Sequence, residues 1–233
     1  MFSSSRLHAL PPVSVRPEGS PAVPDLDFPV SGGPVYRASK RLFDIAVALV
    51  GLVLLVPLLP VIVVLIKLDS PGSIFFRQKR VGEGGRLFTC YKLRSMVQDA
   101  EALKPHLAAL NEATGPAFKI RADPRITAIG AFLRRSSLDE VPQLFNVLLG
   151  DMSIIGPRPQ IPTEVELYEP WHRRRLEVKP GITCLWQISG RSQIGFEDWM
   201  RLDLEYVRTR GWRTDLSILL RTLPAVIARK GAY

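Results

Sequence analysis

The chain has 233 residues, of which 46% are hydrophobic and 23% are charged, with a formal net charge of +9 and a pI near 9.9. This composition allows a buried core and excludes wholesale disorder and collagen-like structure. The length favours one domain. The two cysteines, Cys90 and Cys184, match no metal-ligand spacing. We therefore expect buried free thiols in a reduced, cytosolic setting and no disulfide framework.

The first 36 residues are rich in proline. Seven of the 20 prolines fall within the first 34 positions, mixed with serine, glycine and valine. Such a stretch has no period-2 pattern and cannot hold a regular helix, so residues 1–36 are predicted to be a flexible arm. The sequence assigns no role to this arm.

An uncharged apolar run follows at residues 45–66, and as a straight helix it would extend roughly 33 Å, enough to cross a bilayer. We therefore expect a membrane segment, with a buried core helix as the alternative. Pro57 and Pro60 lie past the middle of the run and predict a kink. Basic residues flank both ends, which places both ends on the cytoplasmic side. The prediction for residues 37–70 is a re-entrant helix-break-helix.

The remainder, residues 71–233, is predicted to be a mostly helical α+β domain. Segments 73–80 and 86–96, joined by a glycine-rich turn at 82–85, predict a β-hairpin. Helical patterns follow at 97–111, 136–149, 162–178, 196–210 and 215–229. Residues 67–233 hold 26 basic and 18 acidic residues, a net +8. This charge suits an anionic membrane surface or a phosphate-bearing substrate and, in principle, nucleic acid.

The last predicted helix carries an apolar stripe. Its members are Leu216, Leu219, Leu220, Leu223, Val226 and Ile227. Such a helix can lie in the membrane interface. The same stripe fits packing against the protein core equally well, and both alternatives stay open.

An acidic pair, Asp139–Glu140, stands at the expected start of a helix, because Pro142 is tolerated only in a first helical turn. A purely structural role is one interpretation, since Ser137 to Glu140 fits a capping box and the macrodipole favours acidic residues there. The functional hypothesis rests on the surroundings. Two arginines at 134–135 precede the pair, and a further arginine follows in a constrained loop.

That further arginine, Arg158, lies between Pro157 and Pro159, which restrict the backbone on both sides. A rigid loop holding a guanidinium suits bidentate capture of a phosphate, because little entropy is lost on binding. An exposed loop arginine without function is the alternative. The stretch from 134 to 160 is therefore the leading candidate for a phosphate-handling site.

Eight ordered blocks between residue 37 and the C-terminus carry a resemblance to a known family. They are KRLFD (40–44), KLDSPGSIFFRQKRVG (67–82), YKLRSM (91–96), DPRIT (123–127), SLDEVPQLFNVLLGDMSIIGPRP (137–159), KPGITCLWQISGR (179–191), LDLEYV (202–207) and the terminal GAY. Together they resemble the bacterial sugar transferases, the monotopic polyprenyl-phosphate phosphoglycosyl transferases. One departure is that Val56 precedes Pro57, where the family typically has Ser-Pro.

The resemblance implies that a UDP-sugar donates a hexose-1-phosphate, of glucose or galactose, to undecaprenyl phosphate with release of UMP, as the first membrane step of exopolysaccharide synthesis. Asp139 matches the family's nucleophile, which forms a covalent phosphosugar intermediate, and Glu140 matches the position that helps to hold Mg²⁺. Both roles agree with general chemistry, since carboxylates act as covalent nucleophiles and Mg²⁺ accepts one or two of them. The residues expected to bind phosphate or substrate are Lys92, Arg94, Arg158, Arg191 and Asp203.

The implied location is the bacterial inner membrane, with the catalytic domain on its cytoplasmic face and membrane lipids as neighbours. A non-catalytic, membrane-anchored scaffold is the alternative function, and it would need Asp139 only as a helix cap. Nucleic-acid binding would account for the charge, but no recognised motif accompanies it, so we expect no nucleic acid. A transferase with many membrane spans is excluded by the single candidate segment in the sequence. The oligomeric state stays open, a homodimer included.

Overall fold

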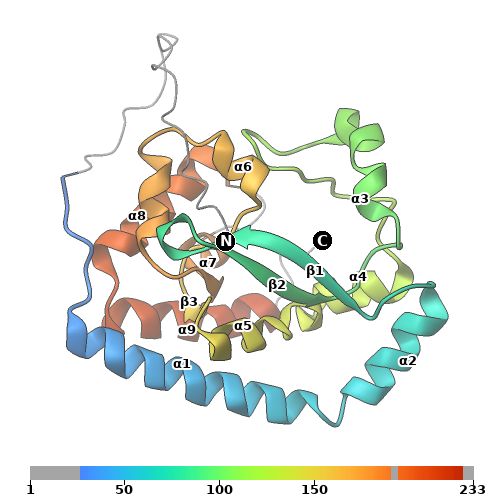
Figure 1. Cartoon of the computed structure of the whole chain (residues 1–233), viewed down its shortest axis with the longest axis horizontal. Coiled ribbons are helices and arrows are strands. Elements are labelled where there is room, and N and C mark those ends of the chain that lie inside the picture. The colour runs from blue at the N-terminus through green and yellow to red at the C-terminus, as the bar shows by residue number, and fades with distance from the viewer. Residues whose placement is uncertain (1–26, 190–193, 228–233) are drawn as a thin grey trace, which may run out of the picture.

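The protein is described from a computed structural model that covers residues 27–189 and 194–227. A long helix, α1 (Pro34–Leu55), runs along one edge, and α2 (Leu59–Asp69) turns away from its end (Figure 1). The other elements lie on one side of α1. The predicted mixed, mostly helical architecture with a β-hairpin is confirmed.

The predicted β-hairpin is present. Strands β1 (Phe75–Val81) and β2 (Leu87–Leu93) pair antiparallel, from Phe75 opposite Leu93 to Val81 opposite Leu87. The tight turn η1 (Glu83–Gly85) joins them, and Gly84 and Gly85 adopt φ of 65° and 79°. Residues with side chains rarely take this conformation, so the glycines permit the turn.

A second, parallel pair of strands was not expected from the sequence. These strands, β3 (Ser153–Ile155) and β4 (Gly181–Thr183), are three residues long, too short for a period-2 pattern to appear. Two glycines allow their close approach. A Cβ on Gly156 would lie 2.3 Å from the Lys179 carbonyl oxygen, and one on Gly181 would lie 2.1 Å from the Gly156 nitrogen.

The two C-terminal helices are confirmed as α8 (Phe196–Thr209) and α9 (Trp212–Ile227), which begins three residues earlier than expected. Two helices were not predicted from the sequence: α4 (Ala128–Arg135) and the short α7 (Leu185–Ile188). In α9, Ile218 is buried and Leu219 packs on the core, whereas Leu216 and Leu220 are exposed. Part of the predicted stripe therefore meets the core and part of it faces outward.

The three other predicted helices are wrong in extent. Residues 97–111 form two short pieces, 136–149 form a turn and a helix, and 162–178 form two pieces. The pieces are α3 (Ala100–Leu103), η2 (Pro105–Leu110), η3 (Leu138–Glu140), α5 (Gln143–Leu149), α6 (Pro162–Glu166) and η4 (His172–Glu177). Pro105, Pro142 and Pro170 lie at these breaks, where each lacks the backbone donor that a continuous helix requires.

The predicted break in the apolar run is present between α1 and α2, next to Pro57 and Pro60, and the two helices are bent by 66°. In the described part of the chain no helix has by itself the length and apolar character needed to cross a membrane, and α1 and α2 pass that test only as a bent pair. Apolar side chains on both helices are exposed by 54% to 68%, namely Val50, Val53, Leu54, Val61 and Val64. Such exposure does not fit the alternative of a buried core helix.

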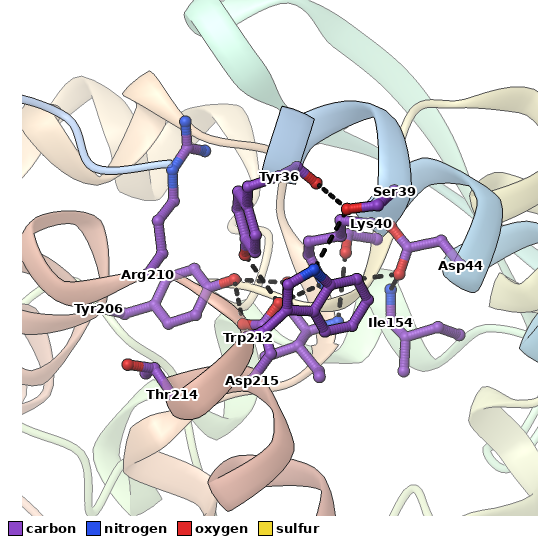
Figure 2. Close-up of polar contacts among 12 residues, drawn as sticks. Tyr36, Ser39, Lys40, Asp44, Ile154, Tyr206, Arg210, Trp212, Thr214 and Asp215 are labelled. Carbon is purple, nitrogen blue, oxygen red and sulfur yellow. Dashed lines mark hydrogen bonds and ion pairs between the residues drawn. The ribbon is translucent and has the colours of Figure 1, made fainter. Parts of the chain in front are cut away.

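Buried polar contacts join the N-terminal half of α1 to the rest of the protein (Figure 2). The Lys40 ammonium lies 2.9 Å from Asp215 Oδ2 on α9, and the Tyr36 hydroxyl donates to the same oxygen over 2.7 Å. Asp44 accepts a hydrogen bond from the Ile154 backbone N–H in β3. Lys40, Asp44 and Asp215 are all less than 10% exposed. The charge of Lys40 thus offsets two buried carboxylates.

The described end of the predicted arm contacts α8. The Ser31 N–H donates to the Val207 carbonyl, and Arg174 lies over the Phe28 ring and donates to its carbonyl oxygen. Residues 27–33 therefore run along the protein, and α1 begins at Pro34, within the predicted arm. Residues 1–26 lie outside the described residues.

We predict that Lys40→Met lowers the free energy of unfolding by about 3–5 kcal/mol, because it leaves Asp44 and Asp215 buried without their cation. Arg37→Met is the matched control, since Arg37 is exposed on the same helix, and we expect a change within about 0.5 kcal/mol. Urea unfolding of the full chain in detergent measures both. Equal stabilities of the two variants would contradict the role of the buried pair.

Candidate active site

The acidic pair lies on the short turn η3, between α4 and α5. Ser137, just before it, has φ of 58° and is the only residue other than glycine with positive φ in the described ranges. The expected capping box is wrong, because the Ser137 side chain caps nothing and α5 begins after Pro142. A residue held in the left-handed region costs roughly 1–3 kcal/mol, and such strain is concentrated at functional sites.

Glu140 is held by two cations. Arg158 Nη2 and Nη1 donate to Glu140 Oε1 and Oε2 over 2.5 and 3.2 Å, and the Lys92 ammonium lies 2.6 Å from Oε1. Burial alone raises the pKa of a carboxyl, but these two charges hold the pKa of Glu140 well below its ordinary value. Glu140 is therefore an anion at neutral pH, and it fixes both cations in place.

Asp139 differs sharply from its neighbour. It is only 7% exposed and accepts no hydrogen bond from the described residues. Burial and the adjacent Glu140 charge raise the pKa of Asp139 to about 6, although Lys92, Arg134 and Arg158 pull it down. At neutral pH it is a carboxylate with weak solvation and no donor, which is the state of a reactive nucleophile.

The β-hairpin supplies Lys92, and Asn146 on α5 fixes the position of that strand. The Asn146 side chain accepts from the Tyr91 N–H over 3.1 Å and donates to the Thr89 carbonyl over 2.7 Å, so it pairs with the edge of β2. Asn146 is fully buried. Its amide thereby ties α5, which follows Glu140 directly, to the strand that carries Lys92.

Arg175 holds the backbone of Arg158. The Arg175 guanidinium donates to the Arg158 carbonyl over 2.6 Å and to Asp203 Oδ2 over 2.9 Å through Nε. Asp203 is fully buried. The sequence predicted that Asp203 binds substrate. In the structure the Asp203 carboxylate is paired with Arg175, whose guanidinium also donates to the Arg158 carbonyl.

Two other predicted residues do not join the cluster. Arg94 donates to the carbonyls of Pro71 and Ser70, both over 2.6 Å, so it closes the end of α2 and does not face Glu140. Its predicted role in binding phosphate is therefore not supported by its contacts. Arg191 lies outside the described residues. The structure brings together Asp139, Glu140, Lys92 and Arg158, and adds Arg134, whose charge acts on Asp139.

The donor set was compared with the needs of Mg²⁺. No three His, Cys, Asp or Glu side chains gather as a metal site in the part of the chain that the structure describes. However, Mg²⁺ commonly takes one or two protein carboxylates and fills its shell with water and substrate phosphates. Asp139 accepts no hydrogen bond and Glu140 Oε2 accepts one, so both retain lone pairs for a cation. The two carboxylates fit this mode of binding.

Sequence reasoning missed the residues that position the site. Ser137, Asn146 and Arg175 carry their roles through backbone conformation and contacts with distant segments, and no local pattern marks such contacts. The one available signal was their place inside or beside the motif blocks at 137–159 and 179–191.

We predict that Asp139→Asn stabilises the protein. The pKa of Asp139 lies at about 6 in the folded state against an ordinary 3.8, so the folded state binds the proton more tightly and the carboxylate destabilises the fold increasingly as pH rises from 4 to 6. Above pH 6 the variant should gain up to about 3 kcal/mol, and the gain should vanish near pH 4. Thermal unfolding of the full chain across this range measures it. Glu140→Gln is the matched comparison and should destabilise, since it leaves Lys92 and Arg158 partly unpaired.

Comparison with known proteins adds independent information. The sequence profile of a family described as bacterial sugar transferase matches residues 35–229. Galactosyl transferase CpsE of Streptococcus agalactiae is 46% identical over 198 residues, which are 84% of this chain and 44% of the relative. Undecaprenyl-phosphate galactose phosphotransferase of Salmonella typhimurium is 42% identical over 202 residues, 84% of this chain and 42% of the relative.

A relative of similar length is also found. The exopolysaccharide production protein ExoY of Sinorhizobium fredii is 38% identical over 204 residues, 86% of this chain and 90% of the relative. The chain thus spans less than half the length of the first two relatives and most of the length of ExoY. The family match covers every residue of the Asp139–Glu140 cluster, and the chain belongs to the bacterial sugar transferase family.

Proposed function

We propose that the chain transfers a hexose-1-phosphate, of glucose or galactose, from a UDP-sugar to undecaprenyl phosphate with release of UMP, in exopolysaccharide synthesis. The observation that carries the proposal is that two adjacent carboxylates on one turn have different surroundings. Asp139 accepts no hydrogen bond from the described residues, whereas Glu140 is bound by two cations. One relative is named undecaprenyl-phosphate galactose phosphotransferase, which supports this reaction class, and another is named exopolysaccharide production protein, which supports this pathway.

The reaction follows in two displacements. An Asp139 oxygen attacks the phosphorus that bears the sugar, the bond from this phosphorus to the bridging oxygen breaks, and UMP leaves with the electron pair. An oxygen of undecaprenyl phosphate then attacks the same phosphorus, and the bond to Asp139 breaks. Splitting the transfer lets two bulky phosphates use one site in turn.

The cations beside Asp139 stabilise the charge that develops during these displacements. Arg158 presents a planar guanidinium and Lys92 a compact ammonium, and both are already ordered by Glu140 before substrate binds. Preorganised charge lowers the barrier without reorganisation during the reaction. Mg²⁺, which we place at Glu140 and Asp139, supplies further positive charge to the pyrophosphate when bound.

The apolar surface supports a place at the inner membrane. Further exposed apolar side chains lie on α5, which packs against α1, at Phe145 and Leu149, and on α9 at Leu216 and Leu220. Clusters of exposed apolar side chains are typical of surfaces that contact a membrane or another protein. In this proposal the bent α1–α2 pair enters the cytoplasmic leaflet and returns. The lipid tail of the acceptor then stays in the bilayer while its phosphate reaches Asp139.

We predict a burst of UMP, up to one equivalent per enzyme, when the purified chain meets UDP-galactose or UDP-glucose with Mg²⁺ in the absence of undecaprenyl phosphate. The covalent intermediate accounts for this stoichiometry. The burst rate should fall tenfold per pH unit below about 6, because only the Asp139 carboxylate attacks. The phosphate of undecaprenyl phosphate also titrates near pH 6, so the experiment without this lipid isolates the titration of Asp139.

Asp139→Asn should abolish the burst while remaining folded, and Glu166→Gln, an exposed change on α6, should leave it intact. Release of UMP only when undecaprenyl phosphate is present would contradict the covalent route. Absence of release from any UDP-sugar, with or without the lipid, would contradict the proposed function.

The re-entrant geometry gives a separate prediction. Cysteines introduced at Arg37 and Ser73, both exposed, should react with a membrane-impermeant maleimide from the same side of sealed vesicles. The two native cysteines are buried and should remain silent. Labelling of the two positions from opposite sides would show that the α1–α2 pair spans the bilayer.

A further inference from the structure

Four buried polar atoms beside the active site have no hydrogen-bond partner among the described residues. They are Arg80 Nε, Gln160 Nε2, Glu164 Oε2 and Arg173 Nε. Leaving one such atom unpaired costs roughly 1–3 kcal/mol, so native proteins keep few of them. Four in one region are therefore unusual, and a bound ligand would supply partners for three of them, those of Arg80, Gln160 and Glu164.

Hydrogen bonds and charge interactions join these four residues into one neighbourhood. Arg80 Nη1 donates to the Pro159 carbonyl over 2.9 Å, and the Val81 N–H donates to the Gln160 carbonyl over 2.9 Å. The charge of Arg80 acts on Glu164. Arg173 Nη2 contacts the Val165 carbonyl, one residue beyond Glu164. The short helix α6 thus packs against the C-terminal end of β1, as Figure 1 shows.

This neighbourhood adjoins the acidic pair on the side of Arg158. Arg80 and Lys92 lie on the same face of the β-hairpin, because Arg80 pairs with Phe88 and alternate residues of β2 share a face. Burial and the nearby Arg158 charge lower the pKa of Arg80, in agreement with their proximity. Arg80 therefore stands between the cluster at Asp139 and the unpaired groups of Gln160 and Glu164.

Arg80, Glu164 and Gln160 offer the partners that the nucleotide half of a nucleoside diphosphate donor needs. Beyond the phosphorus attacked by Asp139 come a second phosphate, a ribose with two hydroxyl donors, and a base. A guanidinium suits the phosphate, a carboxylate accepts from the ribose hydroxyls, and a primary amide presents a donor and an acceptor side by side. That pair complements the N–H and C=O edge of uracil.

We infer that Arg80, Glu164 and Gln160 bind the nucleotide half of the donor, with Arg80 on its phosphate, Glu164 on the ribose hydroxyls and the Gln160 amide on the base. The inference rests on the proposed function, which supplies a UDP-sugar as donor. It assigns recognition of the base and the ribose to the segment directly after the Arg158 loop. One stretch of chain would then contact both the sugar-bearing phosphate and the nucleoside.

Calorimetric titration of the full chain in detergent tests the inference with three probes: UMP, ribose 5-phosphate and inorganic phosphate. Gln160→Met keeps the side-chain length but removes the amide, and it should raise the Kd for UMP about tenfold while leaving that for ribose 5-phosphate unchanged. Glu164→Gln should weaken binding of both ribose-containing probes and not of phosphate. Glu166→Gln, the exposed control on α6, should bind all three as the wild type does.

A stability measurement separates binding from a purely structural role. Because the Gln160 amide nitrogen is buried and unpaired, Gln160→Met should unfold at the same or a higher temperature than the wild type. Wild-type affinity for UMP in both variants, or a loss that extends equally to inorganic phosphate, would overturn the inference. If the wild type releases UMP from UDP-sugars but the variants give one of these results, the proposed function stands and the inference alone fails. A wild type that neither binds nor releases UMP overturns both.

Discussion

The ion pair between Lys40 and Asp215 is the contact on which the placement of the apolar helix pair depends. Two buried carboxylates, Asp215 and Asp44, share this ammonium, and its removal would leave both buried without a cation. Hydrophobic packing alone would let a smooth apolar helix slide or rotate, because such contacts have no direction. The buried Lys40 ammonium faces Asp215 on α9, and this directional contact sets the rotation and the register of α1 on the protein.

The same contacts lead to the active site through β3. Asp44 holds the Ile154 N–H, and the Tyr206 hydroxyl lies 3.0 Å from the Ile155 carbonyl. Arg158 follows Ile155 by three residues and donates a hydrogen bond to Glu140. Helix α1 therefore contacts β3 at its middle residue, Ile154, and the Arg158 loop follows directly after the same short strand. This arrangement keeps the site at a constant distance from the apolar surface.

Charge in the site is divided between two adjacent carboxylates with different tasks. Glu140 binds Lys92 and Arg158 and holds these two cations in place, whereas Asp139 beside them accepts no hydrogen bond from the described residues. Burial and the Glu140 charge make Asp139 more basic, and the neighbouring cations keep it ionised at neutral pH. The turn η3, with its left-handed Ser137, is what presents the two side chains to different surroundings.

The sequence by itself determined the elements with a strong local signal: the apolar run with its break at Pro57, the β-hairpin, the helix at 196–210 and the acidic pair followed by Arg158. Hydrophobic period, proline and glycine encode these features within a few residues. Only the tertiary structure decided what each charge does. Asp203 and Arg94 carry the same charges as residues of the Asp139–Glu140 cluster, yet Asp203 is paired with Arg175 and Arg94 binds the carbonyls after α2. The three-residue strands β3 and β4 and the hydrogen bonds of Asn146 depend on partners distant in the chain. Local sequence patterns do not show which distant segments come into contact.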